Sequence, residues 1–457
     1  MEWLLAGWML ALPALEACVP ARWREAAPES LELLRETPVN CLLADEPAWN
    51  ANLLAKAHEL GFLVLASVPS RDAAAAKRAL DAGADGIAAE GPRSEEMAAW
   101  ARRQGKPLVE IVPRAELRYG ADEKVIATYE GLWAGVRIEK DDSAHARPTG
   151  GPWIETNAGF LAFLRAAAPR AAIWMAHRAP GEPQPVSRYI QAAADAALCG
   201  ARWVLDFDPD FRRRLREGDG KARKDWARLA SVLRFLEERR AESQWPDAAM
   251  LALVADARTG GAVSGGIVDM IAAKHIPVRV VLPEQLPALS GEIRTLLVTA
   301  PDLLTGEQQA AARATARRGA TLVNGPAGWK LAPPPPGQIT YSEEQIKQLD
   351  QIWREVNAII GRRNYGVRVF GAPGMLSALR QSPDGARLAV FLVNYTDYPV
   401  ENITLHFPFR IQRPRLAEPG RVRELEMYEN EEGAGADIDR VADVAIVFVE
   451  RADQPKR

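Results

Sequence analysis

The strongest constraint on the fold is a regular alternation of short apolar runs with amphipathic stretches over residues 39–208. Each apolar run is too short to form a helix, and each intervening stretch repeats its apolar residues at helical spacing. This alternation predicts βα units and a parallel sheet. The expected strands are residues 39–44, 63–68, 86–89, 108–112, 134–138, 172–176 and 203–207.

Helices are expected between these strands at residues 52–60, 72–82, 94–103, 158–167, 188–198 and 226–242. Glycines follow four of them, where a left-handed C-cap prefers glycine: Gly61, Gly83, Gly105 and Gly200. About seven βα repeats in roughly 245 residues fit a (β/α)₈ barrel, which typically needs about 250 residues, better than an open doubly wound sheet. The strand missing from this count is expected in residues 210–246 or 3–12, unless the barrel is irregular.

The remaining chain needs at least one further core, because single cores stop growing near 250–300 residues and this chain has 457. Residues 246–332 restart the alternation, with strands expected at 250–255, 278–282, 295–299 and 321–324 and helices at 266–273 and 307–318. Gly260-Gly261 and Gly265-Gly266 lie after a strand and before a helix but do not spell G-x-G-x-x-G, so a flexible loop is expected there and not a dinucleotide site. A proline run at 333–336 suggests a semi-rigid linker, and Ser342 is placed to cap a helix over 342–360.

From residue 366 onward the pattern changes to short strands separated by turns, at 367–370, 375–381, 388–394, 403–407, 421–426 and 444–450. Residues 382–385 read Ser-Pro-Asp-Gly, a hairpin turn signal, since proline presets one dihedral angle and glycine accepts a positive one. Together these features predict a C-terminal antiparallel β-sandwich.

Composition excludes several functional classes. Lys plus Arg number 57 against 60 for Asp plus Glu, and the resulting charge of −3 provides no overall attraction to nucleic acid or anionic lipid. The three cysteines form no C-x-x-C pair, no two histidines stand at H-x-x-x-H spacing, and no phosphate-binding P-loop motif is present. We therefore expect neither a metal nor a cofactor.

The N-terminal segment allows two interpretations. Residues 4–15 form an apolar run that ends near Cys18, as in a signal segment, yet Glu2 stands where basic residues are usual and Glu16 disrupts the small-residue site. A buried first helix is the favoured interpretation. The run is too short to span a bilayer, so no integral membrane association is expected. A periplasmic or secreted location follows if the run is a signal remnant, and a cytoplasmic one otherwise.

Two segments carry a resemblance to a known family. Residues 295–328 lead from a strand through a helix to Arg318-Gly319-Ala320 before the next strand, and residues 389–407 read AVFLVNYTDYPVENITLHF. The first resembles the glutaminase-like middle domain, and the second the terminal sandwich, of multidomain glycoside hydrolases such as the family 42 β-galactosidases. The resemblance implies a TIM-like (β/α)₈ barrel in residues 1–245, a glutaminase-like α/β domain in 246–340, and a linker helix with an antiparallel β-sandwich in 341–457. It also implies that the middle domain serves assembly, so a homo-oligomer is expected.

Candidate catalytic residues are the acids at the carboxyl ends of the expected barrel strands, where barrel enzymes place their active sites. Glycosidic hydrolysis needs one carboxylic acid to protonate the leaving oxygen and one carboxylate as nucleophile or base. Glu110 lies within the apolar run Val109-Glu110-Ile111-Val112, where desolvation would raise its pKa and suit a general acid. Asp206 and Asp208 share one face of a strand by the period-two rule, so either is a candidate for the second role.

These acids resemble the fourth-strand and seventh-strand pair of the large retaining glycosidase clan, but with a departure. That clan usually has Asn-Glu on the fourth strand and Glu on the seventh, whereas this chain has Val109-Glu110 and aspartates. Residues expected to contact substrate are Glu90, Glu139, Trp174, His177 and Arg178. The structural alternative is that strand-end acids cap helices or pair with arginines, and that tryptophans fill the core.

The main hypothesis is a glycoside-hydrolase-like enzyme acting on oligosaccharide or polysaccharide bonds. A non-catalytic carbohydrate-binding protein on the same scaffold is the alternative, because the Asn-Glu signature is absent. A phosphate-handling barrel enzyme is less favoured, since Asp208-Pro209-Asp210 would repel phosphate.

Overall fold

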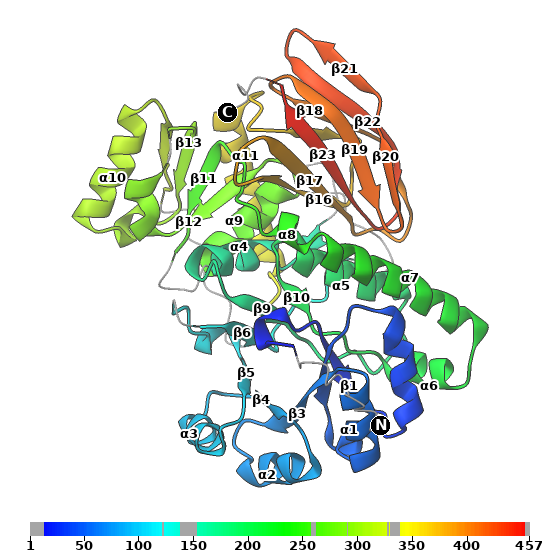
Figure 1. The fold of residues 1–457 in the computed structure, drawn as a ribbon. Helices are drawn as coiled ribbons and strands as arrows, with labels where there is room; N and C mark the ends of the chain where they lie inside the picture. The colour runs from blue at the N-terminus through cyan, green and yellow to red at the C-terminus, as the bar shows by residue number, and fades with distance from the viewer. Residues whose placement is uncertain are drawn as a thin grey trace, which may run out of the picture.

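The computed structural model describes residues 13–120, 123–137, 153–256, 262–289, 291–326, 329 and 339–452. Residues 1–12, on which the interpretation of the N-terminal segment depends, and Glu139 lie outside the described residues. Within the described ranges no helix combines the length and apolarity needed to cross a membrane. Figure 1 shows three parts: a barrel in blue to green, a smaller α/β layer in yellow-green, and a sandwich in orange to red.

The N-terminal part is a closed eight-stranded parallel barrel. Its strands, in spatial order, are β1 (Pro20–Trp23), β2 (Cys41–Ala44), β3 (Leu63–Pro69), β4 (Gly86–Glu90), β5 (Leu108–Val112), β6 (Val125–Thr128), β9 (Ala172–Met175) and β10 (Arg202–Trp203). A parallel bridge between Ala21 and Leu205 joins the last strand to the first, and the Arg22 N–H donates to the Leu205 carbonyl at 2.7 Å. The predicted barrel is thus confirmed.

Two strand assignments from the sequence were wrong. The missing strand is β1, whereas residues 210–246 hold the helices α6 (Pro209–Arg216), α7 (Gly220–Glu238) and α8 (Arg240–Ser243). The run at 134–138 is not a barrel strand: β7 (Gly135–Val136) pairs antiparallel with β8 (Ile154–Glu155), and β6 takes its place between β5 and β9. Both candidate runs are short and apolar, so only pairing with neighbouring strands decides between them. Consequently Glu110 lies on the fifth barrel strand, and Asp206 follows the eighth.

Side chains alternate between the barrel interior and the helical layer. The interior holds a buried hydrophobic cluster that includes Cys41, Leu43, Leu65, Ala88, Val109, Ile111, Ala127, Trp174 and Val204. Helices α1 (Ala51–Glu59), α2 (Ala73–Ala82), α3 (Glu95–Gln104), α4 (Ala158–Ala167) and α5 (Val186–Leu198), with the 3₁₀ helix η2 (Pro28–Glu36), follow the strands. Gly83 and Gly105 end α2 and α3 at φ of 111° and 63°, as the glycine positions predict.

The middle part is a four-stranded parallel sheet with the order β12 (Val278–Val281), β11 (Leu251–Val254), β13 (Thr295–Val298) and β14 (Thr321–Asn324). Its helices are α9 (Ala262–Ala272), α10 (Gly306–Arg317) and α11 (Glu343–Ile360), which agrees with the sequence pattern. Gly265 and Gly266, however, lie inside α9 and not in a loop, and Gly260 and Gly261 lie outside the described residues. A Cβ atom on Gly159 of α4 would overlap the Gly265 carbonyl oxygen, so α4 and α9 pack closely through these glycines.

The C-terminal part is a sandwich of two antiparallel sheets. One has the order β15 (Arg368–Phe370), β18 (Val400–Phe407), β22 (Gly433–Val441) and β21 (Met427–Asn430). The other has β16 (Met375–Gln381), β17 (Arg387–Asn394), β23 (Val444–Arg451), β19 (Ile411–Glu418) and β20 (Arg421–Glu424). The predicted turn joins β16 to β17, with Gly385 at φ of 74°. Strands β19 and β22 were missed because arginine, proline and glycine weaken their apolar alternation, and β21 was missed because its four residues, Met-Tyr-Glu-Asn, contain no apolar run.

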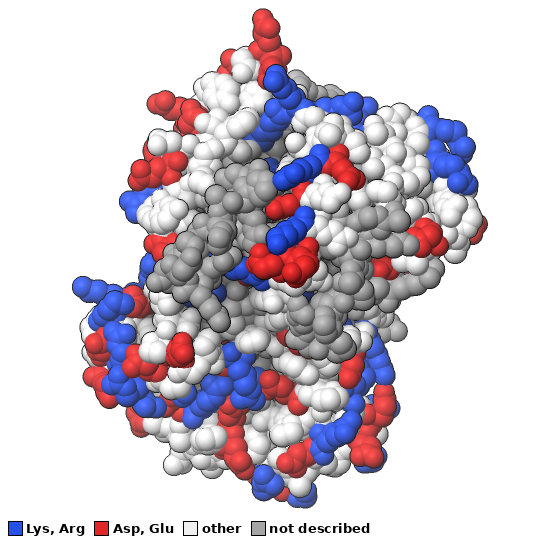
Figure 2. All heavy atoms as spheres, turned by 180° about the vertical axis from the view of Figure 1, so that it is seen from behind, with Lys and Arg blue, Asp and Glu red and all other residues white. Residues whose placement is uncertain are grey.

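Surface charge follows the balanced composition. On the face shown in Figure 2, the basic and acidic side chains are interspersed over the described part of the chain and not gathered by sign.

Candidate functional site

Arg22 organises the carboxyl end of the barrel. It lies on β1 with only 4% of its surface exposed, and its side chain points towards the residues that end the next three strands. Its Nη1 atom lies 3.0 Å from Asp45 Oδ1 and 2.9 Å from Ser67 Oγ, and its Nη2 atom lies 2.9 Å from Glu90 Oε2. A single guanidinium therefore holds together the ends of β2, β3 and β4.

Asp206 closes this group from the opposite side of the barrel seam. Arg24 donates to both of its carboxylate oxygens, through Nη2 at 2.9 Å to Oδ2 and through Nη1 to Oδ1. The Ala179 N–H donates to the same Oδ2 at 3.1 Å, and Arg22 Nε lies 3.7 Å from it. Burial by itself would lower the pKa of Arg24, but the hydrogen bonds and charges of Asp206 and Asp45 outweigh burial and raise it. Asp206 is thus a buried acceptor held by two arginines.

Glu90 and Arg178 form the more accessible side of the mouth. Arg178 Nη2 lies 3.0 Å from Glu90 Oε2, and the Arg178 side chain is 61% exposed. Tyr129, which follows β6, packs against the barrel interior beneath them. Its pKa is raised, first by burial and then by the negative charges of Glu130, Glu116 and Glu90. The mouth therefore combines three arginines with three carboxylates, those of Asp45, Glu90 and Asp206.

Glu110 does not belong to this group. Val109 and Ile111, its neighbours on β5, lie in the barrel interior, so Glu110 points to the outer, helical side of the strand. There it forms an ion pair with Arg93 and does not lie in an apolar environment. The expectation that Glu110 and Asp206 face one another is therefore corrected, because strand register turns Glu110 away from the mouth.

Asp208 also has a structural position. Its carboxylate caps α6 by accepting from the Phe211 N–H at 2.9 Å, and it accepts from the Gln184 N–H at 3.2 Å and from the Tyr189 hydroxyl. Asp206 and Asp208 do not share a face, because the regular strand ends at Trp203 and the period-two rule stops there. Of the three expected catalytic acids, the structure brings only Asp206 to the mouth.

The residues expected to contact substrate also lie only partly in the mouth. Glu90 and Arg178 lie in the mouth, whereas Trp174 has 0% exposure in the barrel interior and is inaccessible to a sugar. Its large apolar ring fills the centre of the barrel, which corrects that expectation. His177 is half-buried beside the mouth. Burial lowers its pKa, and a hydrogen bond with the Gly131 backbone and the charge of Asp206 oppose that change.

A cavity of about 540 Å³ adjoins the mouth between β1, η2, α6 and α7. Arg22 and Arg24 line it together with the aromatic side chains of Trp23, Phe207 and Trp226. Its rim includes Glu25, which pairs with Arg212 at 3.1 Å and with Arg216 at 2.6 Å. The arginines that bind Asp206 thus also form the wall of a space large enough for a ligand.

Arg22, Arg24 and Tyr129 were not found from the sequence, because β1 and β6 were not recognised as strands. The available signal was the spacing of Arg22 and Arg24, two residues apart around Trp23, which predicts charged side chains on one face of a strand. Among the described residues, no three His, Cys, Asp or Glu side chains are grouped so as to hold a metal ion.

Comparison with solved structures places the chain among proteins with a glycosidase fold. The α-L-fucosidase isoenzyme 2 from Paenibacillus thiaminolyticus matches with a TM-score of 0.57 and 11% identity, over 93% of this chain and 96% of that one. A β-galactosidase from Rahnella sp. R3 matches with a TM-score of 0.50 and 11% identity, over 94% and 97%. The GH42 β-galactosidase Gan42B from G. stearothermophilus is also similar, with a TM-score of 0.38, 14% identity and coverage of 65% and 57%.

At the level of fold, the first two of these structures confirm the expected likeness to multidomain barrel glycosidases. No family model and no curated protein sequence matches the chain.

Proposed function

We propose that the protein is a glycoside hydrolase that cleaves glycosidic bonds of an oligosaccharide or polysaccharide at the barrel mouth. The observation that carries this proposal is the contact of Glu90 and Asp206 with the same guanidinium group, that of Arg22. One planar group thus keeps the two carboxylates close together, and glycosidic hydrolysis needs such a pair at a separation of roughly 5–9.5 Å.

Asp206 is the proposed nucleophile or base. Such a group must offer a lone pair, and Asp206 is held entirely as an acceptor by Arg24, Arg22 and the Ala179 N–H. Glu90 is the proposed partner carboxylate. Arg178 forms an ion pair with Glu90, and because its side chain is exposed it can turn from Glu90 to a substrate hydroxyl. The cavity beside Arg24 provides room for a sugar, but Asp206 does not line it and its side chain is only 2% exposed. The Arg24 side chain, which is 21% exposed, must therefore turn aside before a sugar in the cavity can reach Asp206.

A carbohydrate-binding protein without catalysis is the second candidate. One observation favours it: each mouth carboxylate is already bound by arginine, Asp206 by Arg24 and Glu90 by both Arg22 and Arg178. In such a protein the arginines would orient the carboxylates as acceptors for sugar hydroxyls.

A panel of chromogenic aryl glycosides separates the two candidates. We expect hydrolysis by the parent protein and a fall of about 10²–10⁴-fold in Glu90→Gln and Asp206→Asn. Glu110→Gln is the matched control, since this acid lies outside the barrel, and it should retain activity. Unchanged hydrolysis in both mouth variants would reject the assignment. Sugar binding without hydrolysis by the parent would establish the second candidate.

A further inference from the structure

We propose a second ligand site in the middle part of the molecule, for a small neutral polyhydroxylated ligand of monosaccharide size. The site lies at the carboxyl edge of the sheet formed by β12, β11, β13 and β14. It is separate from the barrel mouth in both position and chemistry, so it does not depend on the proposed hydrolysis.

The strand order places an opening at this edge. The chain leaves β11 for β12 on one side, and then returns past β11 to β13 on the other side. The loops that follow β11 and β13 therefore diverge, and in open parallel sheets ligands bind in the crevice at such a switch point.

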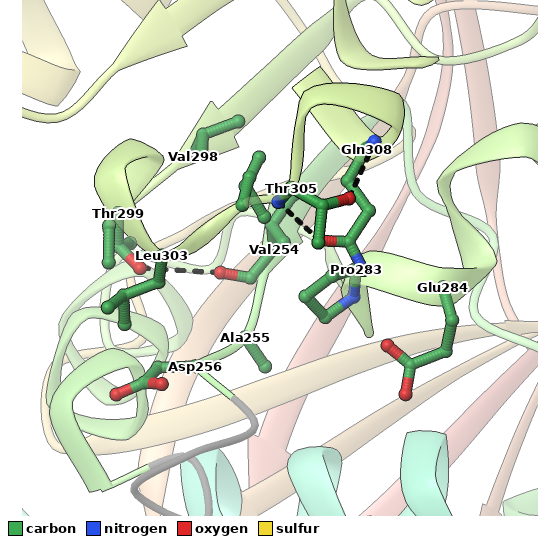
Figure 3. Close-up of a pocket in the computed structure, with 12 residues that line it drawn as sticks. Val254, Ala255, Asp256, Pro283, Glu284, Val298, Thr299, Leu303, Thr305 and Gln308 are labelled. Atoms are coloured by element: carbon green, nitrogen blue, oxygen red, sulfur yellow. Dashed lines mark hydrogen bonds between the residues drawn. The ribbon is translucent and has the colours of Figure 1, made fainter. Parts of the chain in front are cut away.

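A cavity of about 220 Å³ occupies this crevice. Its lining comes from residues that follow three of the strands, with Asp256 after β11, Glu284 after β12 and Thr299 after β13. Figure 3 shows these side chains arranged around the pocket, together with Thr305 and Gln308 from the first turn of α10. Pockets for drug-sized ligands measure about 300–1,000 Å³, so this one suits a smaller molecule.

The wall offers hydrogen-bond acceptors over an apolar floor. Val254, Val298 and Leu303 form part of the floor, and no Lys or Arg stands among the described lining residues. The Thr299 hydroxyl donates to the Val254 carbonyl at 3.3 Å, which leaves its lone pairs to accept. A ligand that fits must therefore donate hydrogen bonds and present an apolar face, as a sugar ring does.

The adjacent helix start does not make the pocket an anion site. The Gln308 N–H donates to Thr305 Oγ1 at 3.3 Å, and the Thr305 N–H donates to Gln308 Oε1 at 2.9 Å. This capping box satisfies two backbone donors, and Glu307 adds a negative charge to the same turn. Phosphate and carboxylate ligands are thereby disfavoured.

The distribution of acceptors distinguishes a polyol from an amine. Acidic groups gathered on one side of a pocket would favour a ligand with a single positive charge, such as an amine. In this pocket the hydrogen-bond acceptors follow three different strands. Several hydroxyl groups spread around a small ring match that arrangement better than one ammonium group.

Calorimetric titration of the full-length protein tests the site. The probes are galactose, glucose and rhamnose, with ethanolamine and inorganic phosphate as alternatives. To remove binding at the mouth, every variant also carries Glu90→Ala and Arg178→Ala, which delete the hydrogen-bonding groups on the accessible side of the mouth. We expect at least one neutral sugar to bind, and its affinity to fall at least tenfold in Asp256→Asn, in Glu284→Gln and in Ala300→Trp, which fills the cavity.

Glu307→Gln is the matched control, because Glu307 lies on the same helix turn but does not line the cavity, and it should leave the affinity unchanged. Absence of sugar binding in the mouth-blocked protein would overturn the proposal. So would affinity unaltered by Ala300→Trp and Asp256→Asn, or binding of ethanolamine or phosphate in preference to every sugar. None of these outcomes bears on glycoside hydrolysis at Asp206.

Discussion

Arg24 donates to both carboxylate oxygens of Asp206, and so links the residue that follows the first barrel strand to one that follows the last. The Asp206 side chain is 2% exposed and that of Arg24 is 21% exposed. Loss of Arg24 would leave the buried Asp206 charge compensated only by Arg22 Nε at 3.7 Å and the Ala179 N–H at 3.1 Å, which makes this contact important for barrel closure as well as for the candidate site.

Arg24→Met should therefore lower the free energy of unfolding by about 3–5 kcal/mol. Urea denaturation at neutral pH measures the change. Arg178→Met is the matched comparison, because its side chain is 61% exposed and its ion pair is expected to contribute only about 0–1 kcal/mol. Equal losses in the two variants would show that Asp206 does not depend on Arg24.

Asp269 should make the protein less stable as the pH rises. Burial raises the pKa of Asp269 well above its ordinary value of 3.8, although the Gly159 N–H donates to it at 2.7 Å. A raised carboxyl pKa in the folded state contributes stability that is complete below 3.8 and is lost as the pH rises through the folded pKa. Asp269→Asn keeps the acceptor for Gly159 without the charge.

The unfolding midpoint of Asp269→Asn should therefore exceed that of the parent protein at pH 7.5. The difference between the two midpoints should shrink as the pH is lowered to 4. Parallel curves for the variant and the parent would show that this carboxyl does not titrate differently on folding.

His275 should make the protein less stable as the pH falls, which is the opposite of the effect of Asp269. Burial lowers its pKa to about 4 from 6.5, and its ring contacts Ser377 Oγ and the Ala372 carbonyl, each at 3.1 Å. A lowered histidine pKa contributes stability that is present above 6.5 and is lost as the pH falls towards the folded value of about 4. Proton NMR should show a His275 ring signal that does not titrate between pH 7 and pH 5. A titration midpoint near pH 6.5 for this ring signal would contradict the burial of His275.

Gly159→Ala should destabilise the contact between α4 and α9. The added methyl group would overlap the Gly265 carbonyl, and forcing extra volume into a packed interface costs about 1–3 kcal/mol. Gly220→Ala, at the first residue of α7, meets nothing within 4 Å and should be neutral or stabilising. Thermal unfolding of the two variants provides the comparison, and a neutral Gly159→Ala would mean that the helices separate without cost.

Features set by local sequence were predicted well. The helix that follows Ser342 was expected from its capping residue, and the Ser342 hydroxyl accepts from the Gln345 N–H at 3.3 Å as such a cap requires. The four strands of the middle sheet were also expected, because each is a short apolar run bounded by polar or turn residues.

The candidate site was predicted only in part, because its geometry depends on contacts between distant segments. Asp206 and Glu90 were expected at the mouth, and both lie there. Glu110 was expected beside them, but the register of β5 turns its side chain outward to Arg93. Arg22 was missed because the charged and aromatic residues of β1 do not form an apolar run, and its membership of the barrel depends on pairing with β2 and on the bridge to Leu205.

By itself, the sequence determined the βα alternation, the helix caps and the change to antiparallel strands after residue 366, since these follow from the spacing of neighbouring residues. Only the tertiary structure decided which acids meet. A carboxylate's direction depends on strand register and on where a strand ends, and both are set by hydrogen bonds to segments far away in the chain. Arg24 and Asp206, separated by 182 positions, become partners solely because the barrel closes.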